Sequence, residues 1–144
     1  MRAYIAAGWF TDEQEAARLE VLRALKVAKI PAYSPKDDLL FVPGNDPYDV
    51  FNANVYEIRS CDFMVASTEG KDMGTLFECG YAYGAGIPII YYYTGTGPFN
   101  LMLSCSAFCV ASNYSDLVKI LKSIDTEGSI FKRKHDILYK GELE

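Results

Sequence analysis

Between Asp72 and Asp116 the chain carries a single charged side chain, Glu78. The sequence around it is apolar and is typical of a buried helix followed by a buried strand. An ionised carboxylate in such surroundings is costly unless it is paired or used in chemistry. The Gly74-Thr75 step ahead of it indicates a helix start and places Glu78 about one turn into that helix. We therefore treat Glu78 as the candidate centre of function.

Composition limits the classes to which the chain can belong. Its 144 residues, half of them hydrophobic, suit one domain with a buried core, and we expect a single domain over 1–144 with a C-terminal tail at 125–144. The net charge of −5 argues against nucleic acids and membranes as partners, because both present anionic surfaces. No apolar run is long enough to span a bilayer, and the N-terminus lacks the apolar region of a signal peptide.

The cysteines and the histidine narrow the chemistry further. The four cysteines form no Cys-x-x-Cys pair and lie in apolar segments, which is typical of reduced core thiols in a cytoplasmic protein. Because His135 is the only histidine, a zinc site or a Ser-His-Asp triad has little support. We therefore expect a cytoplasmic protein with no metal and no cofactor.

Apolar segments and helix-capping signals alternate along the chain. Strands are predicted at residues 4–7, 31–34, 63–67, 89–93 and 107–111. Helices are predicted to begin at Thr11, at Asp46-Pro47, near Gly74, and at Ser115 or Asp116. Strands that alternate with helices indicate a parallel sheet. The predicted fold class is therefore α/β: a single-domain, doubly wound, flavodoxin- or Rossmann-like fold with a largely parallel five-stranded sheet and helices on both faces.

The strand-to-helix loops of such a sheet lie at one edge, where α/β proteins bind ligands. In this chain they are residues 8–10, 33–38, 67–74 and 94–100. We expect four side chains to cluster at or close to this edge: Tyr4, Asp62, Asp72 and Glu78. Residues 36–45 are predicted to form a loop that is too apolar for a simple linker. This loop is either a flap over a pocket or a contact with another subunit.

Several carboxylates around one pocket, without nitrogen or sulfur metal ligands, suit the cleavage of a glycosidic bond. One carboxylate attacks the anomeric carbon and holds the sugar as an ester, while a second acid protonates the leaving group. The structural alternatives are that Glu78 is a satisfied buried acid, that Asp62 caps a turn, and that Asp72 caps the following helix.

Five segments, which span almost the whole chain, carry a resemblance to a known family. They are Tyr4–Phe10, Asn54–Asp62, the motif Asp72-x-Gly74-x-x-x-Glu78-x-Gly80-Tyr81-Ala82, Pro98–Met102 and Tyr139–Glu144. On these segments the chain is similar to the nucleoside 2-deoxyribosyltransferases. Each segment is weak evidence alone, but together and in this order they are strong evidence.

The resemblance implies catalytic roles for four residues. Glu78 would be the nucleophile that takes the 2-deoxyribosyl group, and Tyr4 would hold its carboxylate. Asp62 would contact the base and help to protonate it as it leaves. Asp72 would bind the sugar 3′-hydroxyl and share in the acid work. The substrates would be a 2′-deoxynucleoside and a free nucleobase.

The resemblance also implies a binding site that is shared between subunits of a homo-oligomer, a dimer or a hexamer. Asn100 and Met102 would reach a neighbouring active site and place the 5′-hydroxyl end. The terminal carboxylate of Glu144 would close the site. Gly8 would let the ligand approach the backbone, and the rings of Trp9 and Phe10 either stack on the base or pack the loop.

Two other functions are compatible with the same residues. The first is a 2′-deoxynucleoside 5′-monophosphate N-glycosidase, which shares the fold and the glutamate nucleophile but grips a phosphate. The second is a nucleotide-sensing module without turnover. The segment 39–45 departs from the family pattern, and so does the charged tail, which leaves the choice between purines and pyrimidines open.

Overall fold

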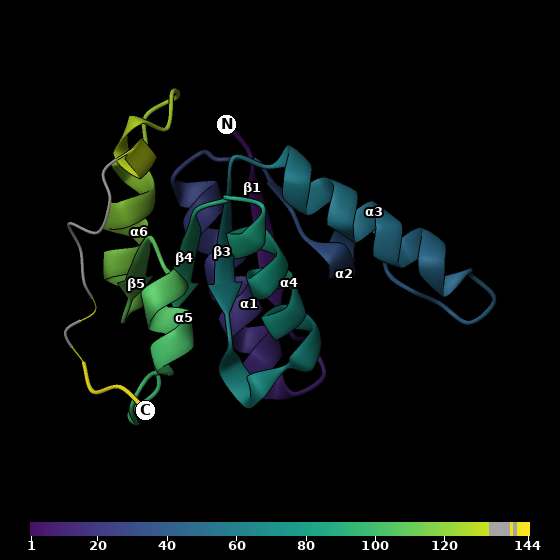
Figure 1. Cartoon of the computed structure of the whole chain (residues 1–144), viewed down its shortest axis with the longest axis horizontal. Coiled ribbons are helices and arrows are strands. Elements are labelled where there is room, and N and C mark those ends of the chain that lie inside the picture. The colour runs from purple at the N-terminus through teal and green to yellow at the C-terminus, as the bar shows by residue number, and fades with distance from the viewer. Residues whose placement is uncertain (133–138, 140) are drawn as a thin grey trace.

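Five parallel strands form the centre of the molecule (Figure 1). The computed structural model describes residues 1–132, 139 and 141–144. The strands are β1 (Ala3–Ala7), β2 (Ala32–Tyr33), β3 (Phe63–Ser67), β4 (Ile89–Tyr92) and β5 (Cys109–Ala111). Their order is β2-β1-β3-β4-β5, and every neighbouring pair is parallel. The chain reverses its direction of travel across the sheet between β1 and β3, which is where folds of this class place their ligands.

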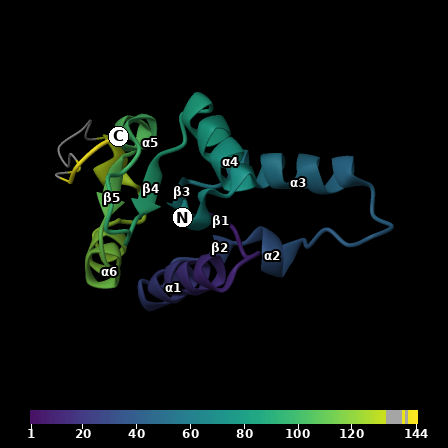
Figure 2. The same ribbon diagram turned by 90° about the horizontal axis from the view of Figure 1, so that it is seen from below.

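Helices cover both faces of this sheet (Figure 2). They are α1 (Asp12–Val27), α2 (Pro35–Asp38), α3 (Pro47–Ser60), α4 (Met73–Gly84), α5 (Leu101–Ser106) and α6 (Tyr114–Lys122), with short 3-10 turns η1 (Glu69–Lys71) and η2 (Ser129–Lys132). Helices α1 and α6 pack on one face through Val21, Leu25, Leu117 and Leu121. On the other face, Ile58 of α3 and Cys79 and Ala82 of α4 meet the strands. The predicted α/β fold class is confirmed.

Local capping signals set most helix starts. Thr11 accepts a hydrogen bond from the Gln14 N–H at 3.2 Å, and Asp46 accepts one from the Tyr48 N–H at 2.9 Å. Both starts were predicted. The start of α6 differs, because Asn113 rather than Ser115 or Asp116 is its cap, and its side chain accepts a hydrogen bond from the Asp116 N–H at 2.8 Å. Asparagine is among the strongest N-caps, so the earlier residue prevails.

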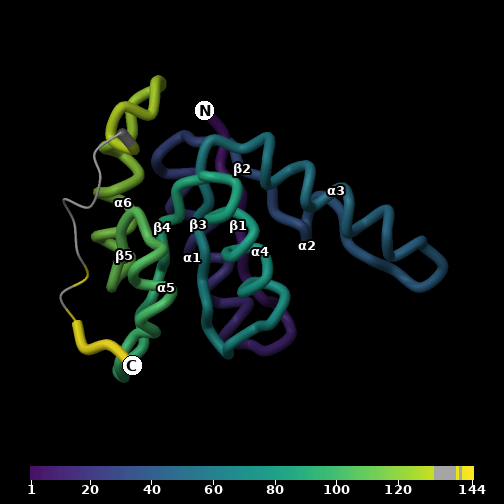
Figure 3. The backbone as a smooth tube through the Cα atoms, viewed as in Figure 1, coloured from purple at the N-terminus to yellow at the C-terminus, as the bar shows by residue number. Residues whose placement is uncertain are grey.

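Helices α3 and α4 are less buried than their sequences indicate. Helix α3 extends away from the sheet (Figure 3), and of its apolar residues Phe51, Val55 and Ile58 only Ile58 is fully buried. Phe51 is half exposed and packs on Phe77 of α4 at a ring distance of 5.7 Å. Helix α4 meets the sheet along one stripe, while other apolar side chains face outward, among them Met73, Phe77 and Tyr83. Within the described chain, nothing covers this apolar surface.

The predicted loop and the tail both contain regular structure. Residues 36–38 of the predicted loop 36–45 lie in the short helix α2, which begins at Pro35. In the tail, Phe131 packs on Phe63 and Phe108, and backbone hydrogen bonds pair 99–101 with 142–144. The expectations for residues 133–138 and 140, including His135, lie outside the described residues. No helix in the described part of the chain is long and apolar enough to cross a membrane.

The buried side chain of Arg18 on α1 forms hydrogen bonds to α2 and to the residue before it. Arg18 is 3% exposed, and its guanidinium donates to Glu15 at 2.8 Å, to Asp37 at 2.6 Å and to the Ser34 hydroxyl at 2.9 Å. These contacts hold the chain that follows β2 against α1. Charged hydrogen bonds of this kind are stronger than neutral ones.

We predict that Arg18→Ala lowers the free energy of unfolding by about 2 kcal/mol, because Asp37 and Ser34 lose a charged donor. Lys26→Ala, an exposed change on the same helix, is the control and stays within about 0.5 kcal/mol of the parent protein. Urea denaturation measures both. Equal stability of the two variants would show that the Arg18 contacts contribute little.

Candidate active site

A single hydrogen bond joins the predicted nucleophile to the sheet. The Tyr4 hydroxyl donates to Glu78 Oε1 at 2.6 Å. Tyr4 belongs to β1 and is fully buried on the face that α4 covers, whereas Glu78 lies on α4 and is partly accessible. The sequence therefore brings together two of its predicted site residues across 74 positions.

The surroundings of Glu78 favour its protonated form. The pKa of Glu78 is raised to about 7. Burial is the largest cause, the hydrogen bond from Tyr4 lowers the pKa, and the charge of Asp72 raises it. The pKa of Tyr4 lies far above its usual range because of burial and the nearby Glu78. Tyr4 is thus a neutral donor, and Glu78 is divided between its two protonation states near neutral pH.

Asp72 is the N-cap of α4. Its Oδ2 accepts hydrogen bonds from the Thr75 N–H at 2.7 Å and from the Thr75 hydroxyl at 2.8 Å. The hydrogen bonds of Asp72 within the described residues all use Oδ2, so Oδ1 is free to accept another. Asp72 both begins the helix that carries Glu78 and contributes to the field at Glu78. Capping and proximity to the nucleophile are therefore combined in one carboxylate.

The structure separates Asp62 from Asp72, which the sequence was expected to bring together. Asp62 precedes β3, so it lies at the opposite edge of the sheet from Asp72, which follows β3. Its Oδ2 accepts a hydrogen bond from the Arg2 N–H at 2.6 Å and lies 3.9 Å from the Met1 amino group. The carboxylate of Asp62 is therefore held by the start of the chain, at the edge of the sheet away from Asp72.

The structure adds two residues that the sequence did not single out. Tyr33 lies beside Tyr4 in the β1–β2 register, and the two rings stack at 5.6 Å. The Tyr33 hydroxyl donates to Asn54 Oδ1 of α3 at 3.0 Å. Tyr33 and Asn54 therefore adjoin the Tyr4–Glu78 pair. Only strand register and helix placement reveal this, so residue spacing alone would not have found them.

The β1–α1 loop contains the predicted ligand-binding residues Gly8, Trp9 and Phe10. A methyl group at Gly8 would lie 2.7 Å from Gln14 Oε1 and 3.1 Å from the Asp72 Cβ. Protein atoms therefore account for glycine at this position, whether or not a ligand also approaches it. The rings of Trp9 and Phe10 stack on each other at 5.1 Å, and Phe10 is exposed.

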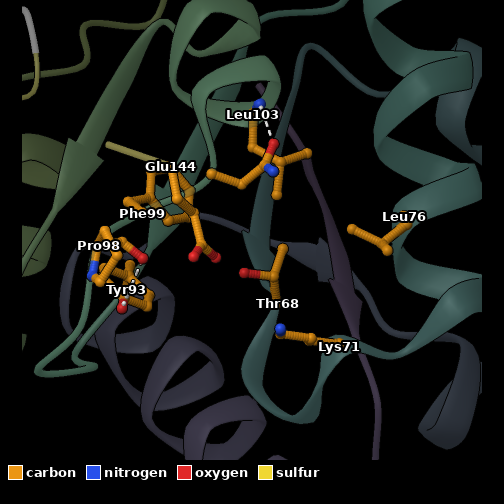
Figure 4. A pocket seen from close by; sticks show the side chains of 9 residues that line it. Thr68, Lys71, Leu76, Tyr93, Pro98, Phe99, Leu103 and Glu144 are labelled. Atoms are coloured by element: carbon orange, nitrogen blue, oxygen red, sulfur yellow. Dashed lines mark hydrogen bonds between the residues drawn. The ribbon is translucent and has the colours of Figure 1, made fainter. Parts of the chain in front are cut away.

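A cavity of about 410 Å³ opens beside α4 and α5 (Figure 4). Two predicted binding residues, Asn100 and Glu144, line it. Lys71 and Glu144 point toward one another across the space, with Thr68 next to Lys71. The remaining walls are mostly apolar and comprise Leu76, Tyr93, Pro98, Phe99 and Leu103.

This cavity and Glu78 lie on different flanks of α4. Leu76 lines the cavity, and Glu78 is two residues further along the helix, which is about 200° around its axis. Glu78 itself is not a lining residue. Met102, the other residue predicted to reach a neighbouring site, is exposed on α5. Within one chain, Asn100 and Glu144 are therefore separated from the nucleophile.

All four cysteines are free thiols. Cys61, Cys79 and Cys109 are buried, and burial raises the pKa of each thiol to between about 11 and about 12. Cys105 differs from the predicted core thiols because it is exposed on α5. In the described part of the chain, no group of three or more His, Cys, Asp and Glu residues is placed to hold a metal ion.

Solved structures of known proteins share this fold. A 2-deoxyribosyltransferase from Bacillus psychrosaccharolyticus matches with a TM-score of 0.75 at 20% identity, over 90% of this chain and 96% of that one. A 2-deoxyribosyltransferase from Leishmania mexicana matches with a TM-score of 0.53 at 22% identity, over 95% and 89%. The CMP N-glycosidase of Clostridium botulinum matches with a TM-score of 0.56 at 16% identity, over 84% and 98%. At these identities the likeness establishes the fold alone.

Sequence comparison supplies the family. A comparison with curated protein sequences gives no match. The family described as nucleoside 2-deoxyribosyltransferase matches residues 3–130, which contain Tyr4, Asp72 and Glu78. The match covers most of the chain and agrees with the fold. This chain therefore belongs to the nucleoside 2-deoxyribosyltransferase family.

Proposed function

We propose that this protein transfers a 2-deoxyribosyl group from one nucleobase to another through a covalent ester on Glu78. The observation that carries the proposal is the Tyr4–Glu78 hydrogen bond of 2.6 Å, which orients a buried carboxylate beside the switch point of the sheet. Membership of the family supports the substrate class. We place the reaction in the cytoplasm, which four free cysteines support.

The reaction proceeds in two displacements at the anomeric carbon. An ionised Glu78 oxygen attacks C1′, the bond from C1′ to the base nitrogen breaks, and the leaving base takes a proton from Asp72 or from solvent, which the incoming base returns in the second step. A second base then attacks C1′ and releases Glu78, so two inversions give retention of configuration. If water attacks instead, the products are free deoxyribose and enzyme. A ribose 2′-hydroxyl would crowd Glu78 and destabilise the cationic transition state, which favours 2-deoxy sugars.

The neighbours of Glu78 have distinct tasks in this scheme. Tyr4 donates to one carboxylate oxygen and leaves the other to attack. Asp72 offers Oδ1 as an acceptor for the sugar 3′-hydroxyl, while Thr75 holds Oδ2.

We propose further that the working enzyme is a homo-oligomer, such as a dimer or a hexamer. Asn100 and Glu144 line a cavity that does not include Glu78, and Met102 is exposed on α5, which supports a role for these residues at the Glu78 of another subunit. Large apolar side chains are exposed on α3, α4 and α5, which supports an interface with other subunits: Tyr48, Phe51, Met73, Phe77 and Met102.

One observation favours hydrolysis of a 5′-monophosphate as a second candidate. Lys71 and Thr68 line the cavity with Asn100 and could hold a phosphate. Glu144 faces Lys71 across the same space and opposes an anionic ligand there. Lys36 of α2 is 2.7 Å from Glu15 and is thus already paired. We therefore rank the transferase first.

The experiment that decides between these reactions is a product analysis. Purified protein is incubated with a 2′-deoxynucleoside and a different free base, and the products are separated by chromatography. We expect a new deoxynucleoside. If the only sugar product is free deoxyribose, or deoxyribose 5-phosphate from a monophosphate substrate, the protein is a hydrolase and not a transferase.

We predict that Glu78→Gln lowers the transfer rate by at least about 10³-fold, because an amide cannot form the ester. Asp62→Asn, a matched change of an acid at the opposite sheet edge, retains transfer. Initial rates and a circular dichroism spectrum measure activity and folding together. A folded Glu78→Gln protein with parental activity would refute the assigned nucleophile.

The same variant should change the pH dependence of stability. The pKa of Glu78 is raised from 4.5 to about 7 in the folded protein, so the folded state holds its proton at pH values where the unfolded state has lost it. The parent protein therefore loses stability as pH rises from 4.5 through 7. We predict that Glu78→Gln is more stable than the parent above pH 8, by at most about 3 kcal/mol, and gains nothing near pH 4. Urea midpoints across this range test the sign.

We predict that Tyr4→Phe keeps the fold and slows ester formation. Loss of the donated hydrogen bond raises the pKa of Glu78 above its present value of about 7, so the acidic limb of the rate profile moves to higher pH. Single-turnover release of the first base, followed from pH 5 to 9, measures this shift. An unchanged profile would remove Tyr4 from the mechanism.

A further inference from the structure

Gln14 has a buried amide that the proposed reaction does not use. It lies in the first turn of α1 and is 6% exposed. Its Oε1 accepts a hydrogen bond from the Phe10 N–H at 2.9 Å. A long polar side chain is seldom buried this fully without a structural or functional reason.

Two glycines make room for this amide. A methyl group at Gly8 would lie 2.7 Å from Gln14 Oε1, and one at Gly70 would lie 2.6 Å from Gln14 Nε2. Both distances are too short for any real side chain. The Gln14 amide therefore lies between the backbones of two loops, the β1–α1 loop at Gly8 and the β3–α4 loop at Gly70. It fits because neither loop carries a Cβ at the point of contact.

Both loops lead directly to the site. The β3–α4 loop ends at Asp72, whose Oδ2 caps α4 and whose charge acts on Glu78. The β1–α1 loop touches Asp72 as well, because a methyl group at Gly8 would lie 3.1 Å from the Asp72 Cβ. Gly70 has a φ of +68° and the following Lys71 has a φ of +54°, so the loop turns through two left-handed residues before Asp72. Left-handed backbone at Lys71 has to be held by its surroundings.

We propose that Gln14 is a positioning residue, which joins the β1–α1 and β3–α4 loops and thereby fixes Asp72 relative to Glu78. The expected effect of Gln14 on catalysis rests on the proposed function. The expected effect of Gln14 on the position of Asp72 does not. Removal of the amide leaves the Phe10 N–H without its acceptor and opens a space between the loops. Asp72 then loses its fixed distance from the nucleophile and from the sugar hydroxyl.

The catalytic consequence is tested by a double-mutant cycle. Gln14→Ala should lower kcat/KM by about 10- to 100-fold, as expected for a misplaced supporting group. In an Asp72→Ala background the same change should cost less than about threefold, because its effect passes through Asp72. In a Tyr4→Phe background it should keep its full effect. Glu13→Ala, an exposed change on the same helix turn, is the control and leaves kcat/KM unaltered.

A pair of glycine variants separates positioning from a general loss of stability. Gly8→Ala pushes on Gln14 and Asp72 and should lower kcat/KM. In the Gly8→Ala/Gln14→Ala double variant the new methyl group occupies space that the amide has left, so kcat/KM should recover in part. Full loss in the double variant, or equal losses from Gln14→Ala with and without Asp72, would overturn the inference.

Amide hydrogen exchange tests whether Gln14 holds Asp72 in place, and it requires no measurement of enzyme activity. The Thr75 N–H donates to Asp72, so its exchange rate reports whether Asp72 is in place. The Thr75 N–H should exchange faster in Gln14→Ala than in Glu13→Ala. The two variants are compared at temperatures equally far below their unfolding midpoints. Unchanged exchange would refute the role of Gln14. If the parent protein neither transfers nor hydrolyses, the proposed function fails, and the exchange measurement still decides on Gln14.

Discussion

The hydrogen bond between the Tyr4 hydroxyl and Glu78 depends on the sheet, on the start of α4 and on the burial of the carboxylate, and it links all three. A carboxylate beside the apolar core is costly unless it has a hydrogen-bond donor, and here the donor comes from the inner strand β1. That donor reaches Glu78 because β1 and β3 are in register beneath α4, and because Asp72 starts α4 at the correct residue. Sheet order, helix start and carboxylate chemistry are therefore tied to one another at this point.

Local signals made most of the scaffold predictable. The caps at Thr11 and Asp46 and the alternation of apolar segments are short-range features, and both survive in the folded chain. The same reasoning should have placed Asp62 correctly. A residue that precedes a parallel strand lies at the edge opposite to one that follows it, so Asp62 and Asp72 cannot share a pocket.

Other features depend on contacts between distant segments, which sequence pattern does not contain. The pairing of Tyr33 with Asn54 needs the β1–β2 register and the position of α3. The space for the Gln14 amide needs two loops to approach each other at glycines. The apolar residues of α3 and α4 were taken for core, but several face outward. The sequence pattern predicts a hydrophobic surface, but it does not distinguish a surface covered by the same chain from one covered by another chain.

The uneven accessibility of the four thiols has a practical consequence. Three of them are sealed in the interior, and burial keeps them protonated at neutral pH, whereas Cys105 lies on the outside of α5. A maleimide fluorophore should therefore attach at one place without any engineering. Because α5 also carries Leu103 on the cavity wall, the dye would report directly on ligand entry or on the arrival of a neighbouring subunit.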